Sequence, residues 1–120
     1  MSIKTFRDLK VWQKSMDVVK EIYKISANFP GDEKYVLTPQ LRRAAISVPS
    51  NIAEGYGRNA TKDYKRFLQI SMGSIYELQT QVEIAFEVNY FNDKEKYIHL
   101  QEKLNELTRM LHSLINKINQ

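Results

Sequence analysis

The sequence contains no cysteine, and it has only three prolines and four glycines among 120 residues. Without cysteine, the chain has no thiol nucleophile, no disulfide framework and no cysteine zinc site. Because prolines and glycines are few, the chain has few places to turn and is expected to form a small number of long elements. Its length fits a single domain over residues 1–120. Such a domain can bury roughly two-thirds of its unfolded surface without a metal or a disulfide.

Long apolar runs are also missing. No segment approaches the roughly 18 consecutive apolar residues of a membrane span. The N-terminal stretch, MSIKTFRDLK, lacks the apolar core of a secretory signal. The default expectation is a cytoplasmic protein that has no membrane partner.

The patterns of common metal and cofactor sites are absent too. There is no Glu-x-x-His pair of a di-iron bundle, no Walker loop and no G-x-G-x-x-G run. His99 and His112 lie about 220° apart around a helix, so they cannot share a metal ion on one face. The run from Gly55 to Arg58 only superficially suggests a phosphate loop, and a helix end explains its glycines better. The sequence therefore predicts no catalytic residue, no metal and no cofactor.

Three loops, near residues 28–32, 55–60 and 89–93, separate four segments with helical periodicity. The predicted helices cover about 8–28, 38–57, 61–91 and 93–118. Their expected N-terminal caps are Asp8, Thr38, Thr61 and Asp93. Pro39 would follow its cap at the first helical position, where the missing backbone donor costs nothing.

Apolar residues recur at steps of three and four in all four predicted helices. The first helix carries two adjacent stripes, and the last two keep one stripe along their full length. Sustained spacing of this kind predicts near-parallel axes that cross at about 20°. Short loops favour antiparallel neighbours, so the expected fold is an all-α, antiparallel up-down-up-down four-helix bundle. The main structural alternative is an extended helical hairpin that dimerises.

The segment 41–58 differs from the other helices because it is rich in small residues and has a proline at its centre. That proline removes one backbone hydrogen bond, which predicts a kink in the second helix or its division in two. Gly55 or Gly57 is expected to end the helix in the left-handed conformation. One flank is small and partly apolar, which favours a contact with another subunit; the alternative is packing under the loop over 29–37. The predicted contact residues are Ile46, Pro49, Ala53 and Gly57.

The net charge of +4 is unevenly distributed along the chain. Residues 34–66 hold seven basic and two acidic side chains, a net of +5, whereas residues 67–120 hold five and seven, a net of −2. This imbalance suggests a polyanionic partner, and the alternative is a solvated basic rim. Tyr56 and Tyr64 lie among the basic groups, where they suit stacking on bases. The predicted nucleic-acid contacts, made through phosphates, are Arg42, Arg43, Arg58, Lys62, Lys65 and Arg66. Glu54 is expected to form a structural ion pair with one of the arginines.

Several short motifs resemble a known family, the four-helix-bundle proteins encoded in intervening sequences of bacterial 23S ribosomal RNA genes. The resemblance spans almost the whole chain, and its most specific part is the proline-centred run Ser47–Gly55. Two positions depart from the family pattern, because Val36 stands where glycine is frequent and Ser71 where alanine is usual. The other matching stretches are Phe6–Leu9 with Trp12, Phe29–Pro30 with Glu33, Leu37–Thr38, Gln40–Ala44, Arg58, Arg66–Leu68, and Gly73–Ser74 with Glu77.

The resemblance implies a cytosolic bundle that assembles into a ring, most often of five subunits. It also implies an analogy with the accessory proteins of diversity-generating retroelements, in which a basic pentamer is thought to bind nucleic acid and a reverse transcriptase. A partner that processes nucleic acid is therefore one expectation for this chain. Positions that match the family and could serve this role are Arg42, Arg43 and Arg58.

Three functional hypotheses follow from the sequence. The leading one is a non-enzymatic homo-oligomer, a homopentamer by resemblance, that binds RNA or DNA through backbone phosphates. The second is a protein-interaction scaffold without affinity for nucleic acid. The third is an enzyme or ligand-binding bundle, which would need a deep polar pocket that contains Glu54.

Overall fold

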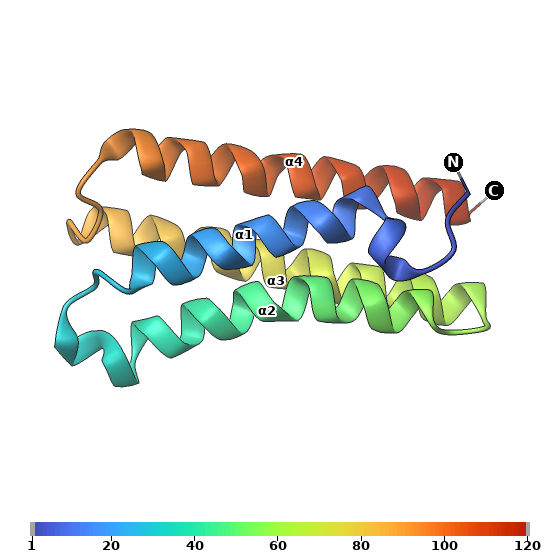
Figure 1. The fold of residues 1–120 in the computed structure, drawn as a ribbon, viewed down its shortest axis with the longest axis horizontal. Helices are drawn as coiled ribbons and strands as arrows, with labels where there is room; N and C mark the ends of the chain where they lie inside the picture. The colour runs from blue at the N-terminus through green and yellow to red at the C-terminus, as the bar shows by residue number, and fades with distance from the viewer. Residues whose placement is uncertain (1, 120) are drawn as a thin grey trace.

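The computed structural model describes residues 2–119 and places four long helices in a bundle (Figure 1). These are α1 (Lys10–Ser26), α2 (Leu37–Tyr56), α3 (Thr61–Glu87) and α4 (Lys94–Ile118). Two short 3-10 turns, η1 (Phe6–Asp8) and η2 (Gly31–Tyr35), precede α1 and α2. Successive helices run in opposite directions, and the described part of the chain contains no strand (Figure 1). The all-α, four-helix prediction is confirmed.

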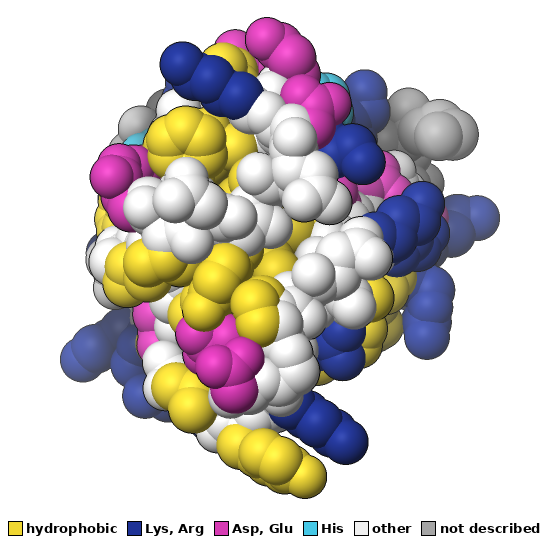
Figure 2. Space-filling model, turned by 90° about the vertical axis from the view of Figure 1, so that its left-hand side faces the viewer, with side chains coloured by type: hydrophobic (Ala, Val, Ile, Leu, Met, Phe, Trp, Pro, Cys, Tyr) yellow, Lys and Arg dark blue, Asp and Glu magenta, His cyan; other side chains and the backbone are white. Residues whose placement is uncertain are grey.

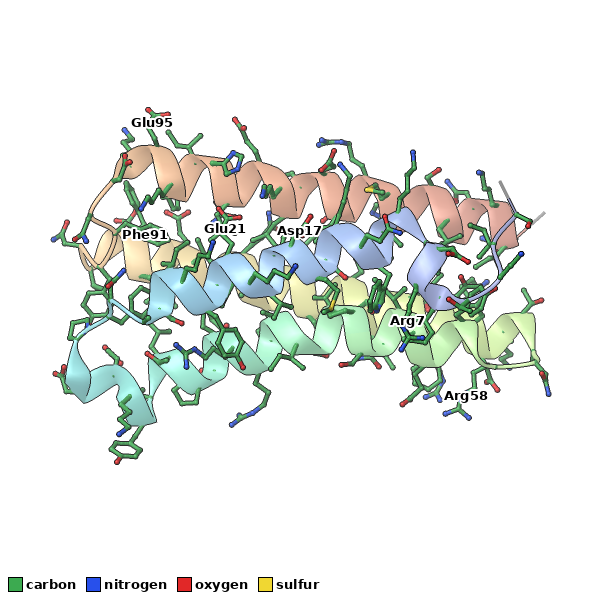
Figure 3. All side chains as sticks on the ribbon, viewed as in Figure 1. Arg7, Asp17, Glu21, Arg58, Phe91 and Glu95 are labelled. Atoms are coloured by element: carbon green, nitrogen blue, oxygen red, sulfur yellow. The ribbon has the colours of Figure 1, made fainter. Side chains whose placement is uncertain are left out.

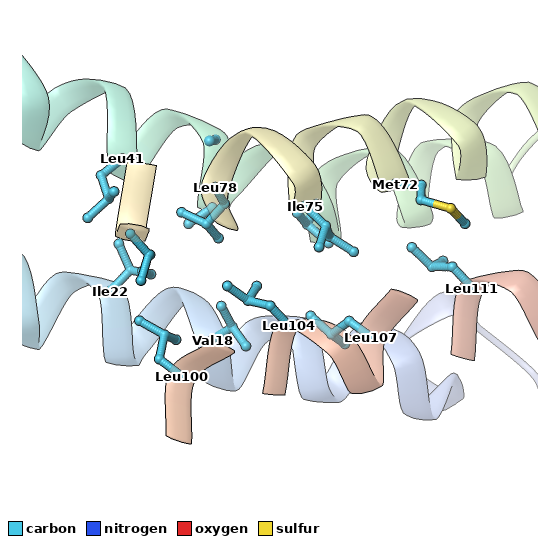
Figure 4. Packing of buried hydrophobic residues seen from close by; sticks show 14 of the residues in the cluster. Val18, Ile22, Leu41, Met72, Ile75, Leu78, Leu100, Leu104, Leu107 and Leu111 are labelled. Carbon is cyan, nitrogen blue, oxygen red and sulfur yellow. The ribbon is translucent and has the colours of Figure 1, made fainter. Parts of the chain in front are cut away.

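The core is a single cluster of apolar side chains from all four helices. Figure 4 shows Ile22 and Leu41 facing Leu100 at one level of the bundle, and Met72 beside Leu111 at another. Each aliphatic side chain of this size contributes about 1.5–3 kcal/mol when it is fully buried. The predicted stripe of α2 is entirely buried, as are the central parts of the α3 and α4 stripes. In α1 the inward stripe consists of Val11, Ser15, Val18 and Ile22, and the stripe beside it is only partly covered.

The capping residues differ from the prediction at three of the four helix starts. Asp93 does cap α4, because its Oδ1 accepts from the backbone N–H of Glu95 at 2.9 Å. Asp8 does not cap α1; its carboxylate closes a capping box with Thr5 around the 3-10 turn η1. The predicted caps at Thr38 and Thr61 are wrong, because both residues lie inside their helices. The missed signals are local turns, which compete with the helix for the same backbone donors.

The two glycines at the end of α2 differ in their roles, and only Gly55 is required by close packing. Gly57 follows the last helical residue with φ −78° and is therefore right-handed, which corrects the expectation of a left-handed end. Gly55 is buried, and a Cβ added there would lie 2.7 Å from the Cβ of Phe67 on α3. A residue without a side chain is therefore required at position 55, since α2 and α3 approach each other too closely for anything larger.

Pro49 lies inside α2, which stays one continuous helix from Leu37 to Tyr56. The proline therefore does not divide the helix, and the expected kink stays a prediction. Beside it, the buried Ser71 hydroxyl of α3 donates to the Val48 carbonyl at 2.9 Å. This bond joins α2 to α3 one residue before the proline.

The α3–α4 connection ends α3 earlier than predicted. Asn89 has φ 67° and is the only non-glycine residue with positive φ among residues 2–119. The backbone N–H of Tyr90 donates to Ala85 at 2.9 Å and that of Asn89 to Phe86 at 3.0 Å. This is the two-bond pattern that closes a helix on a left-handed residue, and asparagine tolerates that conformation.

Candidate nucleic-acid interface

Positive charge is unevenly distributed along the long axis of the bundle. Because neighbouring helices are antiparallel, the start of α1, the end of α2, the start of α3 and the end of α4 lie at one end (Figure 1). We call residues 2–15, 50–72 and 105–119 the basic half; they hold ten basic and four acidic side chains, a net of +6. Residues 16–49 and 73–104, the mixed half, hold eight basic and ten acidic side chains, a net of −2. The whole positive surplus therefore lies at one end of the molecule.

Two predicted arginines converge on one aromatic ring in the basic half. The Arg58 guanidinium lies 4.8 Å from the Phe67 ring centroid, and that of Arg66 lies 5.0 Å from it. Both contacts are within cation–π range and limit the freedom of two long side chains. Phe67 is itself fixed, because its Cβ packs against the α2 backbone at Gly55. The ring thus contacts two guanidinium groups, which are planar cations suited to bidentate hydrogen bonds with phosphate.

The other charges near this pair remain in contact with solvent. Glu54 lies 3.6 Å from Arg58 across one helical turn, and about half of each side chain is exposed, which confirms the expected ion pair. Such a pair is screened and weak, so it leaves Arg58 able to bind an anion. Lys62 is exposed at the first turn of α3. Lys65 donates to the Asn119 Oδ1 at 3.0 Å, which links the start of α3 to the end of α4.

The structure separates Arg42 and Arg43 from the remaining predicted contacts. They lie near the start of α2, about 24 Å along the helix from Arg58 at 1.5 Å per residue. Arg42 is half-buried, donates to the Ser26 hydroxyl at 2.9 Å and lies 4.5 Å from the Tyr23 ring centroid. Its charge therefore anchors α2 to α1, whereas Arg43 is exposed.

Further basic residues, distant in sequence from the predicted ones, also lie in the basic half of the bundle. Figure 3 labels Arg7 in η1 and Arg58 at the end of α2, both at this end of the bundle. The turn η1 packs against α2, and the exposed Lys4, Lys10 and Lys117 belong to the same half. No spacing in the linear sequence identifies these residues. The antiparallel topology does, because it brings both chain ends next to the α2–α3 turn.

The two tyrosines proposed for base stacking are partly occupied with each other. The rings of Tyr56 and Tyr64 meet edge to face with centroids 6.1 Å apart. Burial raises the pKa of the Tyr64 hydroxyl. Both rings are therefore partly engaged in packing the α2–α3 junction, and stacking on bases stays a prediction.

The residues predicted for subunit contact do not all reach the surface. Pro49 is buried within the chain, whereas Ile46 and Gly57 are exposed and Ala53 is half-buried. Ile46 leaves 43 % of its surface in water. The accessible part of this face therefore consists of Ile46, Ala53 and Gly57, and its contact role stays a prediction.

Within the described residues, no group of three or more histidine or acidic side chains is placed to hold a metal ion. Nor does any helix of that part of the chain combine the length and apolar character needed to cross a membrane. None of the five surface hollows described in the bundle is lined by Glu54. The deep polar pocket required by the enzyme hypothesis is therefore not found around this carboxylate.

Comparison with known proteins agrees with the fold. The family described as 23S rRNA-intervening sequence protein matches residues 7–113. The chain is also similar to a crystal structure of a protein with unknown function from the S23 ribosomal protein family of Bacteroides thetaiotaomicron. The TM-score is 0.81 at 22% sequence identity, over 88% of this chain and 95% of the other. No protein with a curated description matches. Since the matching region covers nearly all of the bundle, the chain belongs to the 23S rRNA-intervening sequence protein family.

Proposed function

We propose that this chain is a non-enzymatic, cytoplasmic homo-oligomer, a pentamer by the family resemblance, that binds RNA or DNA through phosphates at its basic half. The observation that supports the proposal most strongly is the segregation of charge, with +6 in one half and −2 in the other. Arg58, Lys62 and Arg66 form its centre, and Lys65 lies beside them. Arg42 and Arg43 are outside it, so we assign them no direct role in the main contact.

The physical basis is the release of counterions. Phosphates attract a condensed layer of cations, and each basic side chain that replaces one of them makes binding more sensitive to salt. A single basic half binds weakly. In a homo-oligomer whose copies point the same way, the basic halves would form one continuous positive rim, which a nucleic acid can follow over several subunits.

The test is fluorescence anisotropy with a labelled single-stranded RNA and a matched DNA over a range of salt. We expect binding at low salt that weakens steeply as salt rises. The double variant Lys62→Glu with Arg66→Glu should lose most of the affinity. The matched control, Arg43→Glu with Lys94→Glu, makes the same charge change in the mixed half and should bind nearly as the wild type does.

An absence of binding at low salt would remove this proposal. An equal loss in the two double variants would show that net charge alone, and not the basic half, attracts the nucleic acid. A wild-type protein that forms an oligomer but does not bind nucleic acid would favour the second candidate, a protein-interaction scaffold. Exposed hydrophobic side chains on α3, among them Ile70 and Ile84, favour that candidate.

A further inference from the structure

One aromatic side chain projects into solvent at the end of the bundle opposite the basic half. Tyr35 leaves 82 % of its surface exposed, and Val36 beside it leaves 57 %, the two highest values among the large hydrophobic residues described. A tyrosine is a frequent anchor of protein interfaces, because its ring buries a large area at a low cost in side-chain entropy. We call Tyr35 and Val36 the knob.

The knob is held firmly by the turn that carries it. Glu33, in the same 3-10 turn, accepts from the Tyr90 hydroxyl at 2.6 Å and from the backbone N–H of Leu37 at 3.3 Å. These bonds tie η2 both to the α3–α4 connection and to the start of α2. The exposed ring is therefore presented from a fixed base, which reduces the entropy lost on docking.

The seam between α1 and α4 carries a series of hollows. The one nearest the α3–α4 connection has a volume of about 120 Å³, and it shares Lys24, Ile25 and Lys96 with a second of about 380 Å³. Ile25 and Phe91 give the first hollow an apolar floor, and Lys24 and Lys96 belong to both. We call this double depression the hollow. Figure 2 faces this end of the bundle and shows hydrophobic side chains across it, with basic side chains toward the edge.

We infer that the knob of one copy docks into the hollow of a second copy of this chain. The chemistry of the two surfaces is complementary. The Lys34 ammonium lies 5.7 Å from the Tyr35 ring centroid within the same copy. The rest of the ring would lie on Ile25 and Phe91, with the ammonium groups of Lys24 and Lys96 near its edge and hydroxyl. Asp32, which lies three residues before Tyr35 and is also exposed, adds a carboxylate for the same lysines.

The placement of the two surfaces decides how copies would associate. The knob lies where η2 meets α2 and the hollow lies on the α1–α4 seam, yet both are at the same end of the bundle (Figure 1). An interface between two different faces is heterologous and forms a ring if its rotation closes. In a ring whose axis follows the long axis of the bundle, faces that share one level would make neighbouring copies parallel, so all basic halves would point the same way. This inference rests on the proposed homo-oligomer and specifies its contact; exposed Ile46 would extend the same side of α2.

Light scattering coupled to size exclusion tests the contact directly. The knob variant is Tyr35→Ser with Val36→Ser, and the hollow variant is Lys24→Glu with Lys96→Glu. All four positions are exposed, so circular dichroism should show unchanged helix content. We expect the wild type to be oligomeric and each variant to be monomeric. The control Tyr76→Ser removes a tyrosine that is 49 % exposed on α3 and should keep the wild-type mass.

Mixing the two variants gives the sharper result. The knob variant keeps an intact hollow and the hollow variant keeps an intact knob, so an equimolar mixture should form a one-to-one dimer and stop there. Variants that keep the wild-type mass would overturn this inference and leave the homo-oligomer standing with another interface. Two monomeric variants that fail to associate when mixed would overturn it as well. A monomeric wild type would reject both the homo-oligomer and this contact.

Discussion

The two halves of the bundle use their polar side chains in different ways. In the mixed half they hold the fold together: Glu33 binds Tyr90, Glu83 accepts from the Tyr97 hydroxyl, and Arg42 joins α2 to α1. In the basic half, Lys14 and Lys65 also join helices, through Glu106 and Asn119, at the surface. Arg58, Lys62 and Arg66 lie near the close α2–α3 contact at Gly55 and remain in reach of solvent. A charge that stabilises the fold is less available to a partner, so the basic half is the better candidate for binding.

The largest effect is expected where the basic half is most tightly packed. Gly55→Ala would place a Cβ 2.7 Å from the Cβ of Phe67, an atom fixed to the α3 backbone. Overpacking of this kind costs about 1–3 kcal/mol. The control Gly73→Ala has no atom within 4 Å and should be neutral or stabilising by up to about 1 kcal/mol, because alanine favours helix. Urea denaturation measures both, and equal effects would show that the close approach at Gly55 is unimportant.

Replacement of the ring that supports the two arginines should separate binding from folding. Phe67→Leu keeps an apolar side chain but removes the face under Arg58 and Arg66, where each contact contributes about 0.5–1 kcal/mol. We expect a modest loss of stability and a clear loss of RNA affinity in anisotropy titrations. Phe86→Leu removes a ring in the mixed half that stacks on the Tyr97 ring with centroids 3.9 Å apart. This variant should keep the wild-type affinity for RNA. Comparable RNA affinities for the two variants would contradict the role of Phe67.

The mixed half should be the more sensitive to alkaline pH. The pKa values of Tyr90 and Tyr97 are raised, chiefly because each hydroxyl donates to a carboxylate, Glu33 or Glu83. The unfolded chain loses these protons near the ordinary tyrosine pKa of about 10, and the folded chain retains them to higher pH. Their stabilisation is therefore complete below about pH 10 and is lost as pH rises through the raised values.

Melting temperature measured across alkaline pH checks this expectation. The double variant Tyr90→Phe with Tyr97→Phe should start from a lower melting temperature at neutral pH and then decline less steeply above pH 10. Tyr76→Phe, an exposed change on α3, is the control. A double variant with the same alkaline slope as the wild type would show that the two hydroxyls do not govern it.

The smallest effect on stability is expected at Glu54, where the substitution should strengthen RNA binding instead of weakening it. Its ion pair with Arg58 is exposed, so Glu54→Gln should change the free energy of unfolding by at most about 0.5 kcal/mol. It also removes a negative charge from the basic half and frees a guanidinium. RNA should therefore bind more tightly and with a steeper salt dependence. Weaker RNA binding after this change would argue that the ion pair with Glu54 holds Arg58 in the position from which it contacts RNA.

The helical periodicity was sufficient to predict four helices and most of the core, because burial imposes steps of three and four on the sequence. It was insufficient at the helix ends. Thr38 and Thr61 have good capping side chains, but α2 starts one residue before Thr38 and α3 starts at Thr61 itself. Asp8 is engaged in a separate turn. Capping depends on the backbone of neighbouring residues, which a residue type alone does not specify.

The candidate site was predictable only in part for a similar reason. Arg58, Lys62, Lys65 and Arg66 are close in sequence and remain close in the structure. Arg42 and Arg43 are also near them in sequence, yet a straight helix carries them toward the opposite end. Arg7 approaches the site only through antiparallel packing. Linear distance is therefore a good guide within one turn of helix and a poor one across a bundle.

Lysine footprinting tests the central claim most directly. The protein is acetylated briefly with and without saturating RNA at low salt, and the modification of each lysine is read by mass spectrometry. The account predicts that Lys62 and Lys65 are protected most, with Lys4, Lys10 and Lys117 following, while Lys20 and Lys94 in the mixed half react as they do without RNA. Equal protection of the two halves, or protection confined to the mixed half, would contradict it.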